Sequence, residues 1–241
     1  MPAAVAFDLA PEGGFDWHEH DHHQLALAGK GVLSMSVDDA TWVLPPSRAL
    51  WVPAGIRHSV ATSARTTMLS LYVEPAGCPL EWAAPTVVNA EGLVGQLVDH
   101  LVVSELDDER RRRAEAVLWD LLEPLEVTAL PTPMPVDERA HRVAEGLKTD
   151  VTDSRSLVEW GREVGASPRT LARLFTAETG MGFERWRTHV RLAAALPLLG
   201  QGQGVTSVAR DVGYTTASAF VAAFKREIGT TPAEYFRTPE P

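Results

Sequence analysis

Residues 164–186 read VGASPRTLARLFTAETGMGFERW, and residues 212–235 read VGYTTASAFVAAFKREIGTTPAEY. The two stretches share a Val-Gly pair, two large apolar residues four positions apart, a glycine and a closing aromatic residue. The offset between them is 48 residues before the turn and 49 after it. Each copy predicts a helix, a glycine-containing break and a second helix, the arrangement of a helix-turn-helix motif. Spacing alone leaves a duplicated hairpin within a helical bundle as the alternative.

The second helix of each copy begins at a capping residue. Ser167 precedes Pro168, which suits the first helical position because its missing N–H has no partner there. Thr215 or Thr216 takes the capping role in the second copy. The face turned away from the apolar stripe carries Arg169, Thr170 and Arg173 in the first copy, and Ser218, Ala219, Ala222 and Lys225 in the second.

Two longer runs carry a family resemblance: SPRTLARLFTAETGMGFERWRTHVRLAAALPLL at 167–199 and VTSVARDVGYTTASAFVAAFKREIGTTPAEYF at 205–236. Together they closely resemble the DNA-binding domain of AraC/XylS-type transcription regulators, over about residues 138–237. The resemblance implies a seven-helix domain that binds double-stranded DNA, with recognition helices at about 167–178 and 216–227. It places these residues at DNA-contacting positions: Ser167, Arg169, Thr170, Arg173, Thr216, Ser218, Ala219, Ala222 and Lys225.

The second copy departs from the commoner family pattern at two positions. An aromatic residue or histidine often stands where Ala219 is found, and arginine where Ala222 is found. Small side chains read base edges poorly, so this helix is expected to serve more for positioning on phosphates, through Lys225 and Arg226.

The first part of the chain has a different texture. Short β-branched and aromatic runs predict strands at Val32–Val37, Thr41–Leu44, Ala49–Val52 and Thr66–Val73, with turn-forming residues between them. Many short strands at close spacing indicate a small barrel or sandwich. From Glu91 onward, apolar residues recur every four positions as far as Leu125, which predicts amphipathic helices. Residues 128–136, TALPTPMPV, contain three prolines and are predicted to be an irregular linker.

Histidines concentrate just before these strands. If residues 18–24 form one extended strand, His18, His20, His22 and Gln24 share its inward face. His23 then falls on the opposite face. Imidazoles two positions apart on a strand can grip one metal ion, and the turn at 53–55 can swing His58 toward them.

The spacing of these residues resembles the two cupin motifs: His18-x-His20-x3-Gln24-x6-Gly31 and Pro53-x-Gly55-x2-His58. The resemblance implies that His18, His20, Gln24 and His58 are metal ligands, for Zn, Ni, Fe or Cu. Most metal-binding cupins have glutamate where Gln24 stands. The alternatives are that the histidines line a pocket for an organic effector, or that they have no functional role.

Charge is distributed unevenly along the 241 residues. Residues 1–136 carry 8 basic and 19 acidic side chains, a net −11, while residues 137–241 carry 14 and 13, a net +1, which sum to −10. An acidic body joined to a more basic half is consistent with nucleic-acid contact, although compositional scatter would also explain it. The single Cys78 excludes an internal disulfide and a thiolate-clustered zinc site.

The sequence therefore predicts an α+β protein with a cupin-like β-barrel and flanking helices at 1–127, a linker at 128–136 and an all-α domain with two helix-turn-helix motifs at 137–241. We expect a cytoplasmic, sequence-specific transcription regulator that is a homodimer, has no membrane partner, and responds to a metal ion or small molecule. A metal-dependent cupin enzyme with a helical regulatory domain is the alternative. A DNA-packaging protein fits the acidic half poorly.

Overall fold

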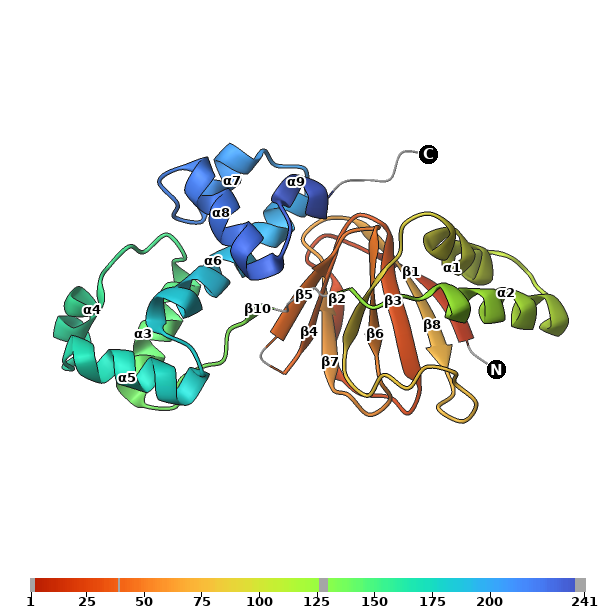
Figure 1. Cartoon of the computed structure of the whole chain (residues 1–241), viewed down its shortest axis with the longest axis horizontal. Helices are drawn as coiled ribbons and strands as arrows, with labels where there is room; N and C mark the ends of the chain where they lie inside the picture. Colours follow the sequence, from red (N-terminus) through yellow and green to blue (C-terminus); the bar gives the residue numbers. More distant parts are fainter. Residues whose placement is uncertain (1–2, 39, 126–129, 237–241) are drawn as a thin grey trace. The chain divides into compact units, whose positions relative to one another are not determined.

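The computed structural model describes residues 3–38, 40–125 and 130–236 (Figure 1). The described residues divide into two compact units, one of residues 3–38, 42–125 and 233–236, the other of residues 40–41 and 130–232. The strands are β1 Ala3–Leu9, β2 Gly14–His18, β3 His23–Lys30, β4 Leu33–Val37, β5 Ala40–Leu44, β6 Arg48–Val52, β7 His58–Ala61, β8 Thr66–Val73, β9 Thr86–Asn89 and β10 Leu130–Pro131. The helices are α1 Leu93–Val103, α2 Asp108–Leu121, α3 Glu138–Thr149, α4 Leu157–Val164, α5 Pro168–Thr179, α6 Phe183–Gly200, α7 Val205–Asp211, α8 Ala217–Ile228 and α9 Pro232–Tyr235.

The strands form two five-stranded sheets. The first has the order β1-β8-β3-β6-β9 and the second the order β10-β5-β4-β7-β2. The side chains that fill the space between them are apolar, chiefly Leu33, Met35, Leu50, Val60 and Met68, all of which are buried. The interior between the sheets is therefore a packed, apolar core.

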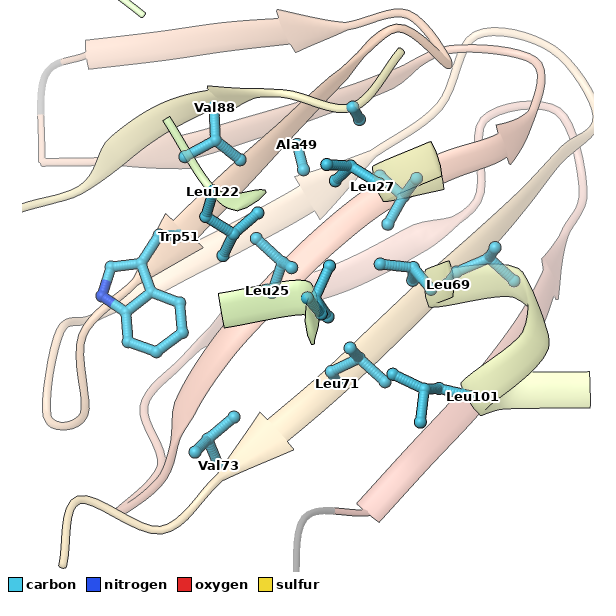
Figure 2. Close-up of a cluster of buried hydrophobic side chains, with 14 residues drawn as sticks. Leu25, Leu27, Ala49, Trp51, Leu69, Leu71, Val73, Val88, Leu101 and Leu122 are labelled. Carbon is cyan, nitrogen blue, oxygen red and sulfur yellow. The ribbon is translucent and has the colours of Figure 1, made fainter. Parts of the chain in front are cut away.

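Strand β3 is covered on both faces. Leu25 and Leu27 point outward into a second cluster that includes Val98 of α1 and Leu118 of α2. Figure 2 shows Leu25 and Leu27 in this cluster, together with Leu101 of α1. Ala26 and Ala28 point the opposite way, into the core between the sheets. Because successive side chains of a strand alternate between its faces, a single strand supports both apolar layers.

The helical unit contains six helices, α3 to α8, within the part of the chain that the structure describes, while α9 falls almost wholly in the first unit. Each recognition helix begins where a hydroxyl side chain satisfies a free backbone N–H: Ser167 accepts from Thr170 at the start of α5, and Thr216 accepts from Ala219 at the start of α8. Gly213, in the turn before α8, has φ of 83°, a conformation that favours glycine. The two expected helix-turn-helix motifs are α4–α5 and α7–α8.

Several details differ from the sequence-based expectations. The expected strand over 18–24 does not exist: β2 ends at His18, and β3 begins at His23 after a short connection. The expected helical pattern stops at Leu121, so Leu125 lies beyond α2. In the expected linker, Leu130–Pro131 pairs with β5 instead of being irregular, while Thr128 and Ala129 lie outside the described residues.

Within the described residues, no helix combines the length and apolar character needed to cross a bilayer.

Candidate functional site

The first recognition helix presents unpaired cations. On α5, Leu171 and Phe175 are fully buried, while Arg169 and Arg173 are exposed on the other side of the helix. In the described part of the chain, neither arginine forms an ion pair, so both are available to phosphates or base edges. Thr170 is half-buried, and its hydroxyl lies 2.8 Å from that of Ser167.

The second recognition helix presents a smaller surface. Phe220 and Phe224 bury the inner face of α8, while the outer face exposes Thr216, Ser218, Ala219, Ala222 and Lys225. Arg226, expected to contact phosphate, is exposed and donates from Nε to Glu227 at 2.8 Å. In this helix the described structure leaves Lys225 as the cation without an ion pair.

A buried carboxylate ties α8 to α6. Glu227 accepts hydrogen bonds from Arg226, from His189 Nε2 at 3.0 Å and from Arg185 Nε at 3.1 Å. His189 also bonds through Nδ1 to the carbonyl of Pro131, in β10. Burial alone raises the pKa of Glu227, but the hydrogen bonds from Arg226, His189 and Arg185 outweigh it and hold that pKa at about 2. This anchor fixes the second recognition helix, and sequence reasoning missed it because its partners lie 38 and 42 residues away.

A histidine cluster lies where the two sheets meet at one end. His18 closes β2 and His58 opens β7, and the two are directly paired in the second sheet, with ring centroids 4.3 Å apart. His20, in the connection before β3, places its ring 5.0 Å from His58 and 6.0 Å from His18. Ring nitrogens of all three lie within 4.8 Å of one another, and His58 is fully buried.

Each of these imidazoles is oriented by the backbone next to it. Nδ1 donates to a carbonyl oxygen two residues away in every case: His18 to Asp16 at 2.7 Å, His20 to His22 at 2.7 Å, and His58 to Ile56 at 2.8 Å. Because a carbonyl oxygen only accepts, the hydrogen lies on Nδ1 and the lone pair on Nε2. This is the tautomer and the outer hydrogen bond typical of metal-bound histidine.

His58 carries the clearest sign of a missing partner. Its Nε2 is buried and has no hydrogen-bond partner among the described residues. Burial lowers its pKa, as do the neighbouring His18 and His20, against a smaller raising effect of the bond to Ile56. The ring is therefore neutral near pH 7 and its lone pair is available.

Gln24 completes the group from the first sheet. The side chain is 1% exposed, and Nε2 donates to Ser70 Oγ at 2.9 Å and to Tyr72 Oη at 3.3 Å, which turns Oε1 toward His20. Oε1 lies 3.3 Å from His20 Nε2. With its hydrogen on Nδ1, His20 would face this oxygen lone pair to lone pair, which requires a proton or a cation between them. Two ligands of one tetrahedral ion with bonds of about 2.1 Å stand about 3.4 Å apart, so the spacing fits a shared ion.

The structure thus brings together His18, His20, Gln24 and His58, and excludes two other histidines. His22, expected to share the inward face, instead contacts Asp21 at 2.6 Å and Glu74 at 3.3 Å. The prediction for His22 was wrong because the extended conformation ends at His18. His23 stacks on Trp51 and accepts from the backbone N–H of Ala54. Its predicted place, on the side of the chain away from the cluster, is confirmed.

This combination of a two-sheet domain and a helical domain with two helix-turn-helix motifs defines a one-chain regulator with separate sensing and DNA-binding parts. The family described as the AraC-like ligand binding domain matches residues 6–144, and the one described as the helix-turn-helix domain matches residues 160–238. The chain belongs to the AraC family of helix-turn-helix transcription regulators. It binds DNA through its C-terminal domain, and its N-terminal domain is a ligand-binding domain.

Individual relatives agree with this assignment. The HTH-type transcriptional regulator NimR of Escherichia coli K12 is 31% identical over 97% of this chain and 87% of its own length. The HTH-type transcriptional activator RhaR of Klebsiella pneumoniae is 23% identical over 97% and 91%. Among solved structures, a crystal structure of an apo ToxT variant from Vibrio cholerae aligns over 98% of this chain and 96% of its own, at 12% identity and a TM-score of 0.40. The two sequence relatives, NimR and RhaR, are thus both named as transcriptional regulators.

The Glu227 anchor gives a stability prediction. Replacing Glu227 with Gln removes the charge that Arg185, His189 and Arg226 share, and is expected to lower the free energy of unfolding by about 1–3 kcal/mol at pH 7. The folded pKa of about 2 lies below the ordinary 4.5. The native carboxylate therefore stabilises the fold above about pH 5 and loses that contribution as pH falls toward 2. Urea unfolding followed by tryptophan fluorescence should show the two proteins converging over this range.

Glu184→Gln is the matched control, because this α6 carboxylate is 73% exposed and pairs with Arg187 at the surface. It should change stability by less than about 0.5 kcal/mol at every pH. A Glu227→Gln deficit that stays constant from pH 7 to pH 3 would show that the anchor is not electrostatic.

Proposed function

We propose that the ligand-binding domain senses a divalent metal ion through His18, His20, Gln24 and His58, and that its occupancy controls DNA binding by α5 and α8. The observation that carries this proposal is the common orientation of the three imidazoles. Each has Nδ1 bonded to a carbonyl, and His58 keeps a buried Nε2 without a partner among the described residues. A buried ring nitrogen left unsatisfied is costly, and a bound cation would satisfy it.

The donor set favours a borderline metal over calcium or magnesium. Three imidazole nitrogens and one amide oxygen suit Zn, Ni, Fe or Cu, whereas calcium and magnesium prefer sets made of oxygen. The ring nitrogens all lie within 4.8 Å of one another, close to the roughly 3.4 Å between two ligands of a tetrahedral site. His18 and His58 belong to the second sheet and Gln24 to the first. A shared ion would therefore tie the ends of the two sheets to each other.

An organic effector pocket and a metal-dependent enzyme are the competing functions. The side chains between the sheets form an apolar, buried cluster, which leaves the histidine end as the polar part of that interior. The relatives are named transcriptional regulators, which supports sensing over catalysis. Turnover lost in His58→Ala, without specific DNA binding by the parent, would establish the enzyme instead.

Metal content tests the sensing site directly. Elemental mass spectrometry of the purified full chain is expected to find close to one metal per molecule. The His18→Ala/His20→Ala double variant is expected to contain almost none, because two nitrogen ligands are gone. His22→Ala/His100→Ala removes the same number of histidines outside the cluster and should keep the metal. Stripping the metal with a chelator should then shift the affinity for operator DNA.

Two results would contradict the proposal. One is a parent protein that takes up no metal after incubation with Zn, Ni, Fe and Cu salts. The other is full occupancy in the His18→Ala/His20→Ala variant. Metal that binds but leaves DNA affinity unchanged on removal would assign it a structural role.

We further propose distinct roles for the DNA-contacting residues. Arg169 and Arg173, exposed and without ion pairs in the described structure, read base edges or phosphates from α5. Ser167 and Thr216 are already engaged as caps of their helices, so they position the N-terminal turns. Lys225 contacts phosphate. The helices approach the groove closely at four small side chains: Thr170, Ser218, Ala219 and Ala222.

Arg173→Ala tests the assignment on DNA selected by the full-length protein from a random-sequence pool. If Arg173 contacts a phosphate, affinity should fall by a similar factor on all sequences, and the salt slope should decrease by about 1. If it reads a base edge, the loss should be about 1–3 kcal/mol and confined to one operator position. Titrations at several salt concentrations distinguish these cases.

Arg112→Ala provides the control, since Arg112 is an exposed α2 cation in the ligand-binding unit without an ion pair in the described structure. It removes the same charge and should leave both affinity and footprint unchanged. An Arg173→Ala protein that behaves the same way would exclude Arg173 from the DNA interface.

We also propose that α1 and α2 form a homodimer interface. These helices expose four large apolar side chains: Leu93 at 54%, Val103 at 69%, Val117 at 46% and Leu121 at 37%. A twofold pair of copies would bury such a face and would match paired operator half-sites.

Val117→Glu tests the interface, because a glutamate buried against apolar side chains loses its hydration. Sedimentation velocity is expected to show a dimeric parent and a variant whose dimer is weakened by at least about tenfold. Val158→Glu on α4 is closely matched, since Val158 is 47% exposed, and should remain dimeric. A monomeric parent, or equal dimerisation by both variants, would place the interface elsewhere.

A further inference from the structure

Tyr72 stands beside the histidine cluster, and none of the roles assigned so far uses it. It lies on β8 directly opposite Gln24 of β3, and Ser70 is two positions earlier on the same face. Its ring meets the His20 ring edge to face, with centroids 5.3 Å apart at 84°. The side chain is half-buried, whereas Ser70 is fully buried. Tyr72 therefore lies beside both Gln24 and His20, and it is more exposed than Gln24.

The hydrogen bonds around Tyr72 leave its O–H as an available donor. Gln24 Nε2 donates to Tyr72 Oη at 3.3 Å and to Ser70 Oγ at 2.9 Å. Ser70, whose oxygen accepts from Gln24, in turn hydrogen-bonds to Tyr72. Either hydroxyl of the Ser70–Tyr72 pair can be the donor. When Ser70 donates, the phenol oxygen accepts from both neighbours and its own hydrogen is free for a ligand.

The charge of the proposed metal ligands indicates what that donor would meet. His18, His20 and His58 are neutral when they bind a metal through Nε2, and the Gln24 amide is neutral as well. Among the described residues, the cluster of potential metal-ligating side chains consists of the three histidines, without a carboxylate. A divalent cation held by these four groups keeps its full double charge in a partly buried position. Such a cation binds an external anion strongly, because little solvent or protein charge compensates it.

We propose that a small carboxylate binds at this place as a fifth ligand, with one oxygen on the metal beside the four protein ligands and the other accepting the Tyr72 O–H. This inference rests on the metal site of the proposed function. A carboxylate fits because its two oxygens can bridge a cation and a hydrogen-bond donor on the same side. The packed apolar core behind the cluster, which includes Met35 and Val60, limits the ligand to a small one. Tyr72 is then a specificity-determining residue for the effector, and metal and carboxylate are sensed together.

The test uses the full chain with Co²⁺ as the metal, because the visible absorption of Co²⁺ reports each change of its ligands. Co²⁺ is titrated first into the parent and into Tyr72→Phe, which keeps the ring and removes the hydroxyl. Acetate is then titrated into each Co²⁺-loaded protein at constant ionic strength. Tyr214→Phe, in the helical unit, serves as the control for loss of a half-buried tyrosine hydroxyl.

The expected result is Co²⁺ binding by all three proteins, because Gln24 keeps its hydrogen bond to Ser70 when the Tyr72 hydroxyl is removed, and a saturable spectral change with acetate at saturating Co²⁺. The acetate affinity of Tyr72→Phe should be at least about tenfold weaker, the effect of losing one hydrogen bond to a charged acceptor. Co²⁺ binding with no acetate response, or with equal acetate affinity in parent and Tyr72→Phe, would overturn the carboxylate inference and leave the metal site standing. A parent that binds no Co²⁺ would overturn the proposed metal site itself, and the inference with it.

Discussion

The register of β3 against its two neighbours is the constraint on which the ligand-binding unit depends. β3 lies between β8 and β6, and its five central side chains, from Gln24 to Ala28, are all buried. A shift by one residue would turn Leu25 and Leu27 into the space between the sheets and expel Ala26 and Ala28 from it. It would also move Gln24 away from Tyr72 and Ser70. The apolar layers on both sides of β3 therefore fix the position of the Gln24 side chain near the start of the strand.

The histidine cluster depends much less on distant parts of the chain for its orientation. Every Nδ1 bond runs to a carbonyl two residues away, so the adjacent backbone sets the tautomer of each ring. What the tertiary structure adds is proximity, through the pairing of His18 with His58 in the second sheet and the approach of β3 from the first. The neighbouring backbone orients the nitrogens, and the junction of the sheets brings them together. This division explains why the cluster can keep a defined geometry at the edge of the packed core.

Much of the fold could be predicted from sequence, and the limits have physical causes. Thr66–Val73 is a strand with the expected bounds, and both recognition helices begin within one residue of expectation. Hydrophobic periodicity and capping residues are local signals, so these elements could be predicted from the sequence. Strands β2 and β7 were not predicted from the sequence. Their short segments, GFDWH and HSVA, lack the alternation of β-branched residues that marks a strand.

The candidate sites show the same limit. Motif spacing selected the four residues that the structure brings together, although the reason given for His20 was wrong, since a turn and not a strand carries it. The spacing also placed His22 on the inward face, because the alternation of side chains along a strand does not reveal where the strand ends. Tyr72 and Glu227 escaped altogether. Their roles arise from cross-strand register and from partners on another helix, neither of which leaves a pattern in the neighbouring sequence.

The two recognition helices differ in the charge they can offer to DNA. α5 carries two arginines without ion pairs in the described structure, whereas on α8 Glu227 engages Arg226 and leaves Lys225. The ligand-binding half of the chain is strongly acidic and opposes approach to a polyanion. Attraction to DNA therefore has to come from cations of the helical unit, of which α5 presents Arg169 and Arg173 and α8 presents Lys225 without an ion pair in the described structure. Each recognition helix thus relies on one or two such charges, and the loss of one of them removes a large part of what that helix offers to phosphates.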